Sequence, residues 1–130
     1  MVKRIYHWGP VVAYCTAIFV QSSFPTPDQL PGFTFSDKLL HVLAYAILGA
    51  LVCRGAKTIN GWRHRRGVLI FIGTCAATLY GLSDEWHQSF VVGRSAEWAD
   101  ALADFGGSLA GSWIYVWIMY RRWRSAASGS

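Results

Sequence analysis

Residues 80–104 read YGLSDEWHQSFVVGRSAEWADALAD, and this stretch decides how the rest of the chain is interpreted. Apolar sequence flanks it on both sides. Ionisable groups beside apolar segments are costly in a bilayer and usually mark a functional site. The stretch therefore predicts a polar site at the ends of membrane-embedded helices. It holds five of the seven carboxylates of the protein, together with a histidine, a glutamine and an arginine: Asp84, Glu85, Glu97, Asp100, Asp104, His87, Gln88 and Arg94.

The composition of the 130-residue chain is typical of a membrane protein. Charged residues make up 15% of the sequence, whereas a soluble domain usually carries about 25%. Apolar residues reach 53% and there are seven tryptophans. Mean hydropathy is only +0.27, which indicates short spans or spans interrupted by polar groups. The odd number of cysteines, three, argues against a disulfide framework.

Four apolar segments are expected to be transmembrane helices, at about 5–24, 37–53, 67–83 and 97–120. Their apolar cores of about 17–20 residues are near the lower limit for crossing ~30 Å of hydrocarbon at 1.5 Å per residue. Ser36 and Asp37 are an N-cap signal for the second helix. Residues 125–130 are small and polar and are expected to form a flexible tail. We therefore predict one all-α domain over residues 1–130, an integral membrane bundle of four helices.

The distribution of charge predicts the orientation of the bundle. All seven acidic residues and only two basic ones, Lys38 and Arg94, fall on one side of the predicted spans. The positive-inside rule then places both termini and the 54–66 loop in the cytoplasm. Topology and anionic lipid account for the basic loops, so we expect no nucleic-acid partner. The other ten of the twelve basic residues lie at the two ends or in the middle loop: Lys3, Arg4, Arg54, Lys57, Arg63, Arg65, Arg66, Arg121, Arg122 and Arg124.

Polar residues recur at helical spacing at the extracytoplasmic ends of three predicted helices. Residues three or four apart share a helix face, so each set forms one stripe. We expect the three stripes to meet in a single acidic cluster. Small residues deeper in the fourth helix, from Gly107 to Ser112, would let helices approach closely. The stripes are Asp37, Lys38, His41 and Tyr45; then Tyr80, Asp84, His87 and Gln88; then Glu97, Asp100 and Asp104.

The cluster contains residue types suited to catalysis or to ligand recognition. Asp84, His87 and Asp100 are the candidate acid/base residues. The Arg94 guanidinium suits a phosphate or carboxylate, or else forms a bridge to Glu97. Alternatively, the acidic residues pair with Lys38 and Arg94 and have no ligand. The candidate ligand-binding residues are Asp37, Lys38, His41, Tyr45, Glu85, Gln88, Arg94 and Asp104.

The sequence assigns no cofactor. A divalent metal is an alternative that we do not favour, because no H-E-x-x-H motif is present. Histidines that hydrogen-bond carboxylates explain the same residues. Were a metal bound, its nitrogen and oxygen ligands would come from His41, Asp84, His87 and Asp100.

These residues resemble the VanZ-like family of membrane proteins, over about Ile18 to Gly111. The resemblance implies a small multi-pass protein of the bacterial cytoplasmic (inner) membrane. The family's namesake is associated with low-level resistance to the glycopeptide teicoplanin. Val92 stands where a proline often precedes the Gly-Arg pair. The matching parts are Ser22-Ser23, Asp37-Lys38-x-x-His41-x-x-x-Tyr45, Asp84-Glu85-x-x-Gln88-x-Phe90-x-x-Gly93-Arg94 and Asp100-x-x-x-Asp104-x-x-Gly107.

Several functions fit this pattern. We favour recognition or processing of a lipid-linked or amphiphilic envelope ligand, such as a phospholipid, a polyprenyl-phosphate carrier or a lipoglycopeptide. A structural or accessory protein, in which the polar cluster only locks the bundle, is the first alternative. A membrane-embedded metal-dependent hydrolase is the second. A proton-coupled or cation transporter with four short helices would require an oligomer. The sequence also lacks charged residues deep in the cytoplasmic halves of the helices, so it shows no continuous relay. The sequence leaves the ligand, any catalysis and the oligomeric state open.

Overall fold

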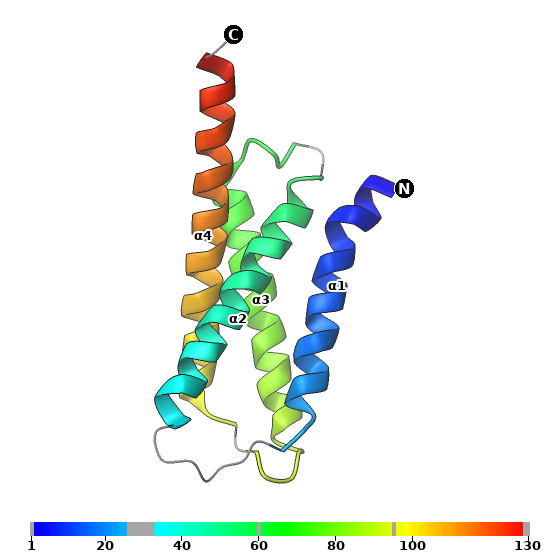
Figure 1. Cartoon of the computed structure of the whole chain (residues 1–130), viewed down its shortest axis with the longest axis vertical. Coiled ribbons are helices and arrows are strands. Elements are labelled where there is room, and N and C mark those ends of the chain that lie inside the picture. The colour runs from blue at the N-terminus through cyan, green and yellow to red at the C-terminus, as the bar shows by residue number, and fades with distance from the viewer. Residues whose placement is uncertain (1, 26–32, 60, 95, 129–130) are drawn as a thin grey trace.

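The computed structural model contains four helices, α1 (Val2–Ser22), α2 (Phe33–Ala56), α3 (Arg66–Gln88) and α4 (Trp98–Ser128). It describes residues 2–25, 33–59, 61–94 and 96–128, with the side chains of 2–4 and 33–37 left out, and these residues include no strand. Successive helices run in opposite directions (Figure 1). The start of α1, the α2–α3 connection and the end of α4 therefore lie at one end of the bundle. The predicted all-α class is confirmed.

The helix bounds differ from the predicted segments mainly at the ends. Helix α2 begins at Phe33, about one turn before the predicted start at Asp37. Helix α4 continues to Ser128, so the described part of the expected tail is helical. Alanines 126 and 127 are strong helix formers. The Ser125 hydroxyl also donates a hydrogen bond to the Arg121 carbonyl at 3.1 Å, within the same helix.

Glycines allow α2 and α4 to form the most extensive interface in the bundle. A Cβ atom at Gly107 would overlap the carbonyl oxygen of Val42, and one at Gly111 would overlap that of Ala46. The two backbones therefore approach too closely for any larger residue. The packing role that the sequence predicts for these small residues is confirmed.

The interior changes from apolar to polar along the bundle axis. Apolar clusters fill the middle and the end that holds the chain termini, around Leu48 and Leu69. At the opposite end, the buried side chains are mostly polar or charged, so this end is the place to look for a site. These residues are Ser22, Asp84, Glu85, Gln88, Asp100 and Asp104.

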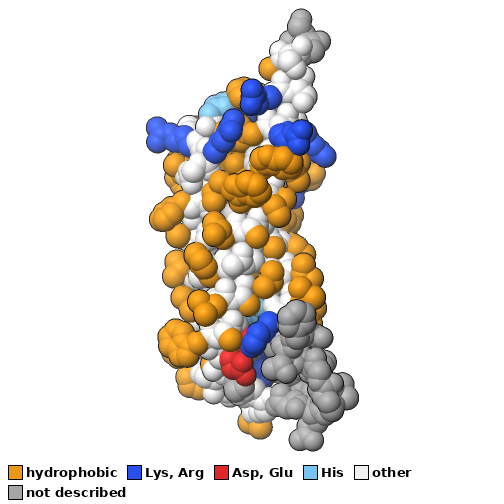
Figure 2. All heavy atoms as spheres, turned by 90° about the vertical axis from the view of Figure 1, so that its left-hand side faces the viewer, with side chains coloured by type: hydrophobic (Ala, Val, Ile, Leu, Met, Phe, Trp, Pro, Cys, Tyr) orange, Lys and Arg blue, Asp and Glu red, His pale blue; other side chains and the backbone are white. Residues whose placement is uncertain are grey.

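The outer surface between the two ends is apolar. Large hydrophobic side chains are exposed on every helix, including Val12, Leu43, Phe71 and Trp113. Figure 2 shows such side chains along one face, between an end rich in Lys and Arg and an end where acidic side chains appear. Exposed apolar surface this extensive marks an interaction site or a membrane contact. Two described segments, Lys38–Ala56 and Arg66–Gln88, are long and apolar enough to cross a membrane.

Candidate functional site

Asp84 lies at the centre of a hydrogen-bond network between α1 and α3. The Ser22 hydroxyl donates to Asp84 Oδ1 at 2.5 Å, and Gln88 Nε2 donates to Asp84 Oδ2 at 2.9 Å. All three side chains are buried. Asp84 and Gln88 are one helical turn apart on α3, while Ser22 is the last residue of α1. The network therefore joins the two helix ends, and each carboxylate oxygen receives a donor.

Arg94 connects the same network to the carboxyl end of α1. Gly93 has a φ of +83°, a left-handed conformation that favours glycine and turns the chain back beneath the bundle. Arg94 Nε donates to the Phe24 carbonyl at 3.1 Å, and Arg94 Nη2 donates to the Gln21 carbonyl at 3.2 Å. Arg94 Nη1 donates to Gln88 Oε1 at 3.3 Å. A cation at the carboxyl end of a helix is also favoured by the helix dipole.

Lys38 forms a second polar group with the start of α4. Its Nζ atom lies 3.1 Å from Glu97 Oε2 and 3.0 Å from Asp100 Oδ1. The Asp100 side chain is buried, whereas that of Glu97 is about half exposed. Glu97 therefore pairs with Lys38, and the alternative bridge from Arg94 to Glu97 is not found among the described contacts.

His41, Glu85 and Asp104 form the third and deepest group. His41 Nδ1 lies 2.9 Å from Asp104 Oδ1, and the Glu97 amide donates to Glu85 Oε2 at 3.3 Å. One ligand-type atom from each of the three residues lies within 4.8 Å of the other two. The exposed fractions of Asp104 and Glu85 are 1% and 7%. Asp104 Oδ2 and Glu85 Oε1 are buried and have no hydrogen-bond partner among the described residues.

Gly81 makes room for this third group. A Cβ atom at Gly81 would lie 2.6 Å from Asp104 Oδ2 and 3.0 Å from Tyr45 Cε1. The Tyr45 ring is also nearly parallel to the His41 ring, with centroids 6.3 Å apart. Sequence reasoning missed Gly81, although it precedes Glu85 by four residues just as Tyr80 precedes Asp84. That spacing places a residue without a side chain directly beside an acidic one.

The three candidate acid/base residues have separate partners. His87 turns toward α1, where its Nε2 lies 3.2 Å from Ser23 Oγ and its ring lies 4.7 Å from that of Phe19. Asp84 bonds Ser22 and Gln88, and Asp100 bonds Lys38. Asp84 and Asp100 nevertheless both lie within electrostatic range of Asp104.

Two other sequence predictions concern the ligand set. Of the residues proposed for a metal, only His41 belongs to the compact third group, whose other members are Glu85 and Asp104. Asp37 lies in α2, but its side chain is outside the described ones, so its predicted ligand-binding role stays a prediction.

A cavity of about 190 Å³ opens beside the first and third groups. Its lining combines apolar side chains from α1 and α2 with hydrogen-bonding side chains from α1, α2, α3 and the segment after α3. Such a mixture of apolar surface and a few convergent polar groups is typical of a ligand site. The apolar lining residues are Ile18, Leu40 and Ala44, and the polar ones are Gln21, His41, Tyr45, Asp84, Gln88 and Arg94.

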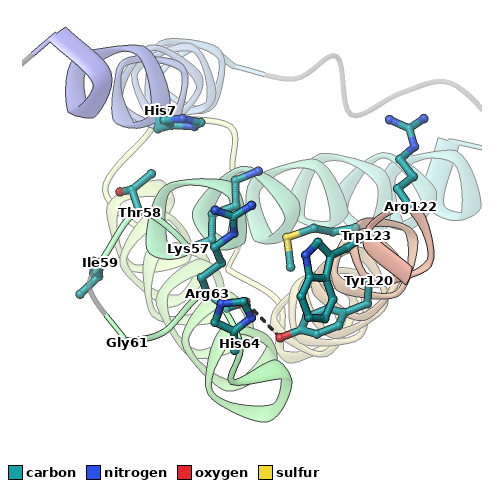
Figure 3. A pocket seen from close by; sticks show the side chains of 11 residues that line it. His7, Lys57, Thr58, Ile59, Gly61, Arg63, His64, Tyr120, Arg122 and Trp123 are labelled. Carbon is teal, nitrogen blue, oxygen red and sulfur yellow. Dashed lines mark hydrogen bonds between the residues drawn. The ribbon is translucent and has the colours of Figure 1, made fainter. Parts of the chain in front are cut away.

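A larger hollow, about 820 Å³, lies at the opposite end of the bundle. Figure 3 shows it between His7 of α1, the α2–α3 connection and the end of α4. Its lining includes Lys57, Arg63 and Arg122, and the Tyr120 hydroxyl closes one side by donating to the Arg63 carbonyl at 3.0 Å. The α2–α3 connection there is largely exposed. We place the candidate site at the acidic end, because the buried charged groups converge there.

The sequence comparison identifies the family. Residues 5–120 match the family model for VanZ/LLP1. The chain belongs to the VanZ-like family. No curated protein and no solved structure matches it.

The family match confirms the resemblance found in the sequence, and its range contains all three polar groups of this VanZ-like protein. The D-E-x-x-Q…G-R string divides between two groups. Asp84, Gln88 and Arg94 belong to the network at the end of α1, whereas Glu85 belongs to the deeper group with Asp104.

Proposed function

We propose that this VanZ-like protein is a multi-pass protein of the bacterial cytoplasmic membrane with four spans. Both termini and the α2–α3 connection face the cytoplasm in this arrangement, as the positive-inside rule requires. The two long apolar segments and the apolar side chains exposed on every helix support a membrane location. The acidic end of the bundle then faces the extracytoplasmic side.

At that end, the protein binds the polar head of a lipid-linked or other amphiphilic envelope molecule. The observation that carries this proposal is the mixed lining of the 190 Å³ cavity, which combines apolar side chains with hydrogen-bonding ones. The apolar lining residues Ile18, Leu40 and Ala44 suit a hydrocarbon chain, and Leu40 is also part of the exposed apolar surface of the bundle. The polar lining residues, which include Asp84 and Arg94, suit the head of the same molecule.

The polar residues that line the cavity indicate the chemistry of that head. Arg94 donates three of its five N–H groups to described residues. The other two can bind an acceptor such as a phosphate or carboxylate. Asp84 presents carboxylate oxygens that accept from an amine, amide or hydroxyl. A head that combines an acidic group with a donor fits both residues. Amine-bearing phospholipids, lipid-linked envelope precursors and lipoglycopeptides such as teicoplanin have this chemistry, and a link to teicoplanin resistance is part of the proposal.

A second candidate is a structural or accessory protein whose polar end only locks the bundle. The bonds from Arg94 to the carbonyls of Gln21, in the last turn of α1, and Phe24, just after it, favour this candidate, because they already give the guanidinium a role within the protein. A hydrolase that uses Asp84, His87 and Asp100 together is less favoured, because each of these side chains has its own separate partner.

Native mass spectrometry of protein released directly from membranes tests the proposal. We expect the wild-type protein to retain one class of amphiphile, and we expect Asp84→Asn to reduce its occupancy at least about tenfold, the effect of losing one charged contact worth 1.4 kcal/mol or more. Glu97→Gln is the matched control, because it removes a carboxylate of the same end that does not line the cavity.

Size-exclusion chromatography would show whether each variant stays folded. A folded Asp84→Asn protein with unchanged occupancy, or a wild-type protein that retains no particular amphiphile, would contradict recognition and favour the locking role. Arg94→Lys keeps the positive charge but removes the planar fork. It should lower occupancy as well, and it provides a second test if Asp84→Asn fails to fold.

A further inference from the structure

Two buried carboxylate oxygens of the third polar group are unsatisfied. Asp104 Oδ2 and Glu85 Oε1 have no hydrogen-bond partner among the described residues, although each side chain is more than nine-tenths buried. Each carboxylate has a partner at its other oxygen, His41 for Asp104 and the Glu97 amide for Glu85. A buried carboxylate oxygen that is left unpaired is nevertheless destabilising unless a cation or a proton compensates it. Both oxygens belong to residues that meet at one point with His41. The arrangement therefore requires a positively charged occupant or a shared proton.

The basic residues of this end are engaged elsewhere. Lys38 pairs with Glu97 and Asp100. Arg94 donates to two carbonyls and to Gln88. Asp84 adds a further buried carboxylate within electrostatic range of Asp104. The described side chains thus leave His41 as the one ionisable nitrogen in contact with the deep pair of carboxylates, which is too little positive charge for the buried group.

We propose that His41, Glu85 and Asp104 bind one divalent transition-metal ion. The ligand set is one imidazole nitrogen and two carboxylate oxygens, which suits Zn²⁺ or Mn²⁺ better than Ca²⁺ or Mg²⁺. Two ligands of one ion at 2.0–2.2 Å lie at most about 4.4 Å apart. The three atoms of the protein lie within 4.8 Å of one another, so small side-chain movements bring them into range.

The surroundings also fit a metal centre. The Tyr45 hydroxyl is buried and has no hydrogen-bond partner among the described residues. The Tyr45 ring stacks beside His41 and its edge lies next to Gly81, as does Asp104 Oδ2. A water molecule on the ion would give this hydroxyl its partner. The cavity lined by His41 and Tyr45 supplies an entry path, so the ion does not have to cross the packed core.

This ligand set shares only His41 with the set expected from the sequence. Spacing along α3 suggested Asp84 and His87, but Asp84 receives hydrogen bonds from Ser22 and Gln88. His87 lies against α1. The metal site does not depend on the proposed amphiphile, because none of its three ligands has to contact the head.

Isothermal titration of ZnCl₂ into the full-length protein, purified in detergent and stripped with EDTA, tests the site. We expect one Zn²⁺ per chain and a higher melting temperature in its presence, since an ion that binds only the folded state stabilises it. MgCl₂ at the same concentrations should do neither. Glu85→Gln, Asp104→Asn and His41→Gln should each weaken binding at least about tenfold.

Matched controls lie at the same end of the bundle. Glu97→Gln removes a carboxylate paired with Lys38, and His87→Gln removes the histidine bonded to Ser23; both should bind Zn²⁺ as the wild type does. Binding that survives all three ligand variants, or no stoichiometric Zn²⁺ in the wild type, would overturn the proposal and leave the carboxylates sharing protons.

The absorption spectrum of the wild type loaded with Co²⁺ gives a readout that does not need a folded variant. A Co²⁺ spectrum without a thiolate charge-transfer band indicates oxygen and nitrogen ligands and supports the site. A thiolate band would place the ion at a cysteine and contradict the proposal. Failure of the metal site is also distinguishable from failure of amphiphile recognition. In the first case the EDTA-stripped protein still retains its amphiphile, and in the second Zn²⁺ still binds.

Discussion

Ser22 and Asp84 are 62 residues apart in the sequence, yet the Ser22 hydroxyl donates to the Asp84 carboxylate at 2.5 Å. Ser22 ends α1, the helix that otherwise has little contact with α3. The bond therefore fixes the α1 side of the cavity relative to α3. Together with Arg94, it makes the position of α1 depend on the polar network.

Removing the Ser22 hydroxyl should weaken the contact between the end of α1 and α3. We expect Ser22→Ala to lower the free energy of unfolding by about 1.5–3 kcal/mol, the usual contribution of a buried hydrogen bond to a charged group. Unfolding of the detergent-solubilised protein, monitored by circular dichroism, measures the change. Ser83→Ala is the control, because among the described residues that exposed hydroxyl bonds only the Tyr80 carbonyl of its own helix. An equal loss in both variants would argue against a stabilising contact between Ser22 and Asp84.

Replacing Arg94 should expose the end of α1 to solvent exchange. Arg94→Gln removes the donors to the carbonyls of Gln21 and Phe24, so amides near residues 20–24 should exchange faster. Hydrogen exchange with mass spectrometry follows this segment directly. Arg65→Gln, an exposed arginine at the start of α3, should leave it unchanged. Protection of residues 20–24 that is equal in both variants would contradict the anchoring role.

The contact between α2 and α4 should not accept a methyl group at Gly111. Its Cβ would overlap the backbone carbonyl of Ala46, which cannot move aside as a side chain can. We expect Gly111→Ala to destabilise the bundle by about 1–3 kcal/mol or more, as overpacked interiors do. Gly106→Ala has open space around its new Cβ and should be neutral or stabilising by up to about 1 kcal/mol. If Gly111→Ala and Gly106→Ala change the melting temperature by the same amount, helix propensity determines the effect and the close approach of α2 and α4 does not.

The proposed link to teicoplanin resistance predicts a change in the antibiotic susceptibility of cells that express the protein. Expression in a teicoplanin-susceptible bacterium should raise the minimal inhibitory concentration of teicoplanin, and Asp84→Asn should abolish the increase at equal protein level. Glu97→Gln should keep it. An increase that persists in Asp84→Asn would separate resistance from the cavity.

Much of the fold follows from the sequence for simple physical reasons. The apolar segments predict the helices, and the segregation of charge predicts which helix ends lie together. The spacing Gly107-x-x-x-Gly111 predicts a close helix contact, because only a residue without a side chain permits it. The ends of α4 are less predictable, since Ala126 and Ala127 continue the helix into a stretch that composition alone marks as a tail.

The arrangement within the site depends on information that spacing in one helix does not contain. Asp84 and Glu85 are adjacent, yet one faces Ser22 of α1 and the other faces the start of α4. His87 shares a stripe with Asp84 but turns toward Phe19. Which neighbouring helix a stripe meets is decided by the packing of the whole bundle. Sequence reasoning therefore found the cluster but not its division into three groups.

The proposed recognition of an envelope ligand depends on the acidic end facing out of the cell. The most direct test is cysteine labelling in spheroplasts, with Cys15, Cys53 and Cys75 replaced by alanine. Val92→Cys places a thiol at a position that is 89% exposed at the acidic end, and Ser125→Cys places one near the end of α4. With a membrane-impermeant maleimide, we predict labelling of Val92→Cys in intact spheroplasts and of Ser125→Cys only after permeabilisation. The reverse pattern, or labelling of both positions before permeabilisation, would contradict the account.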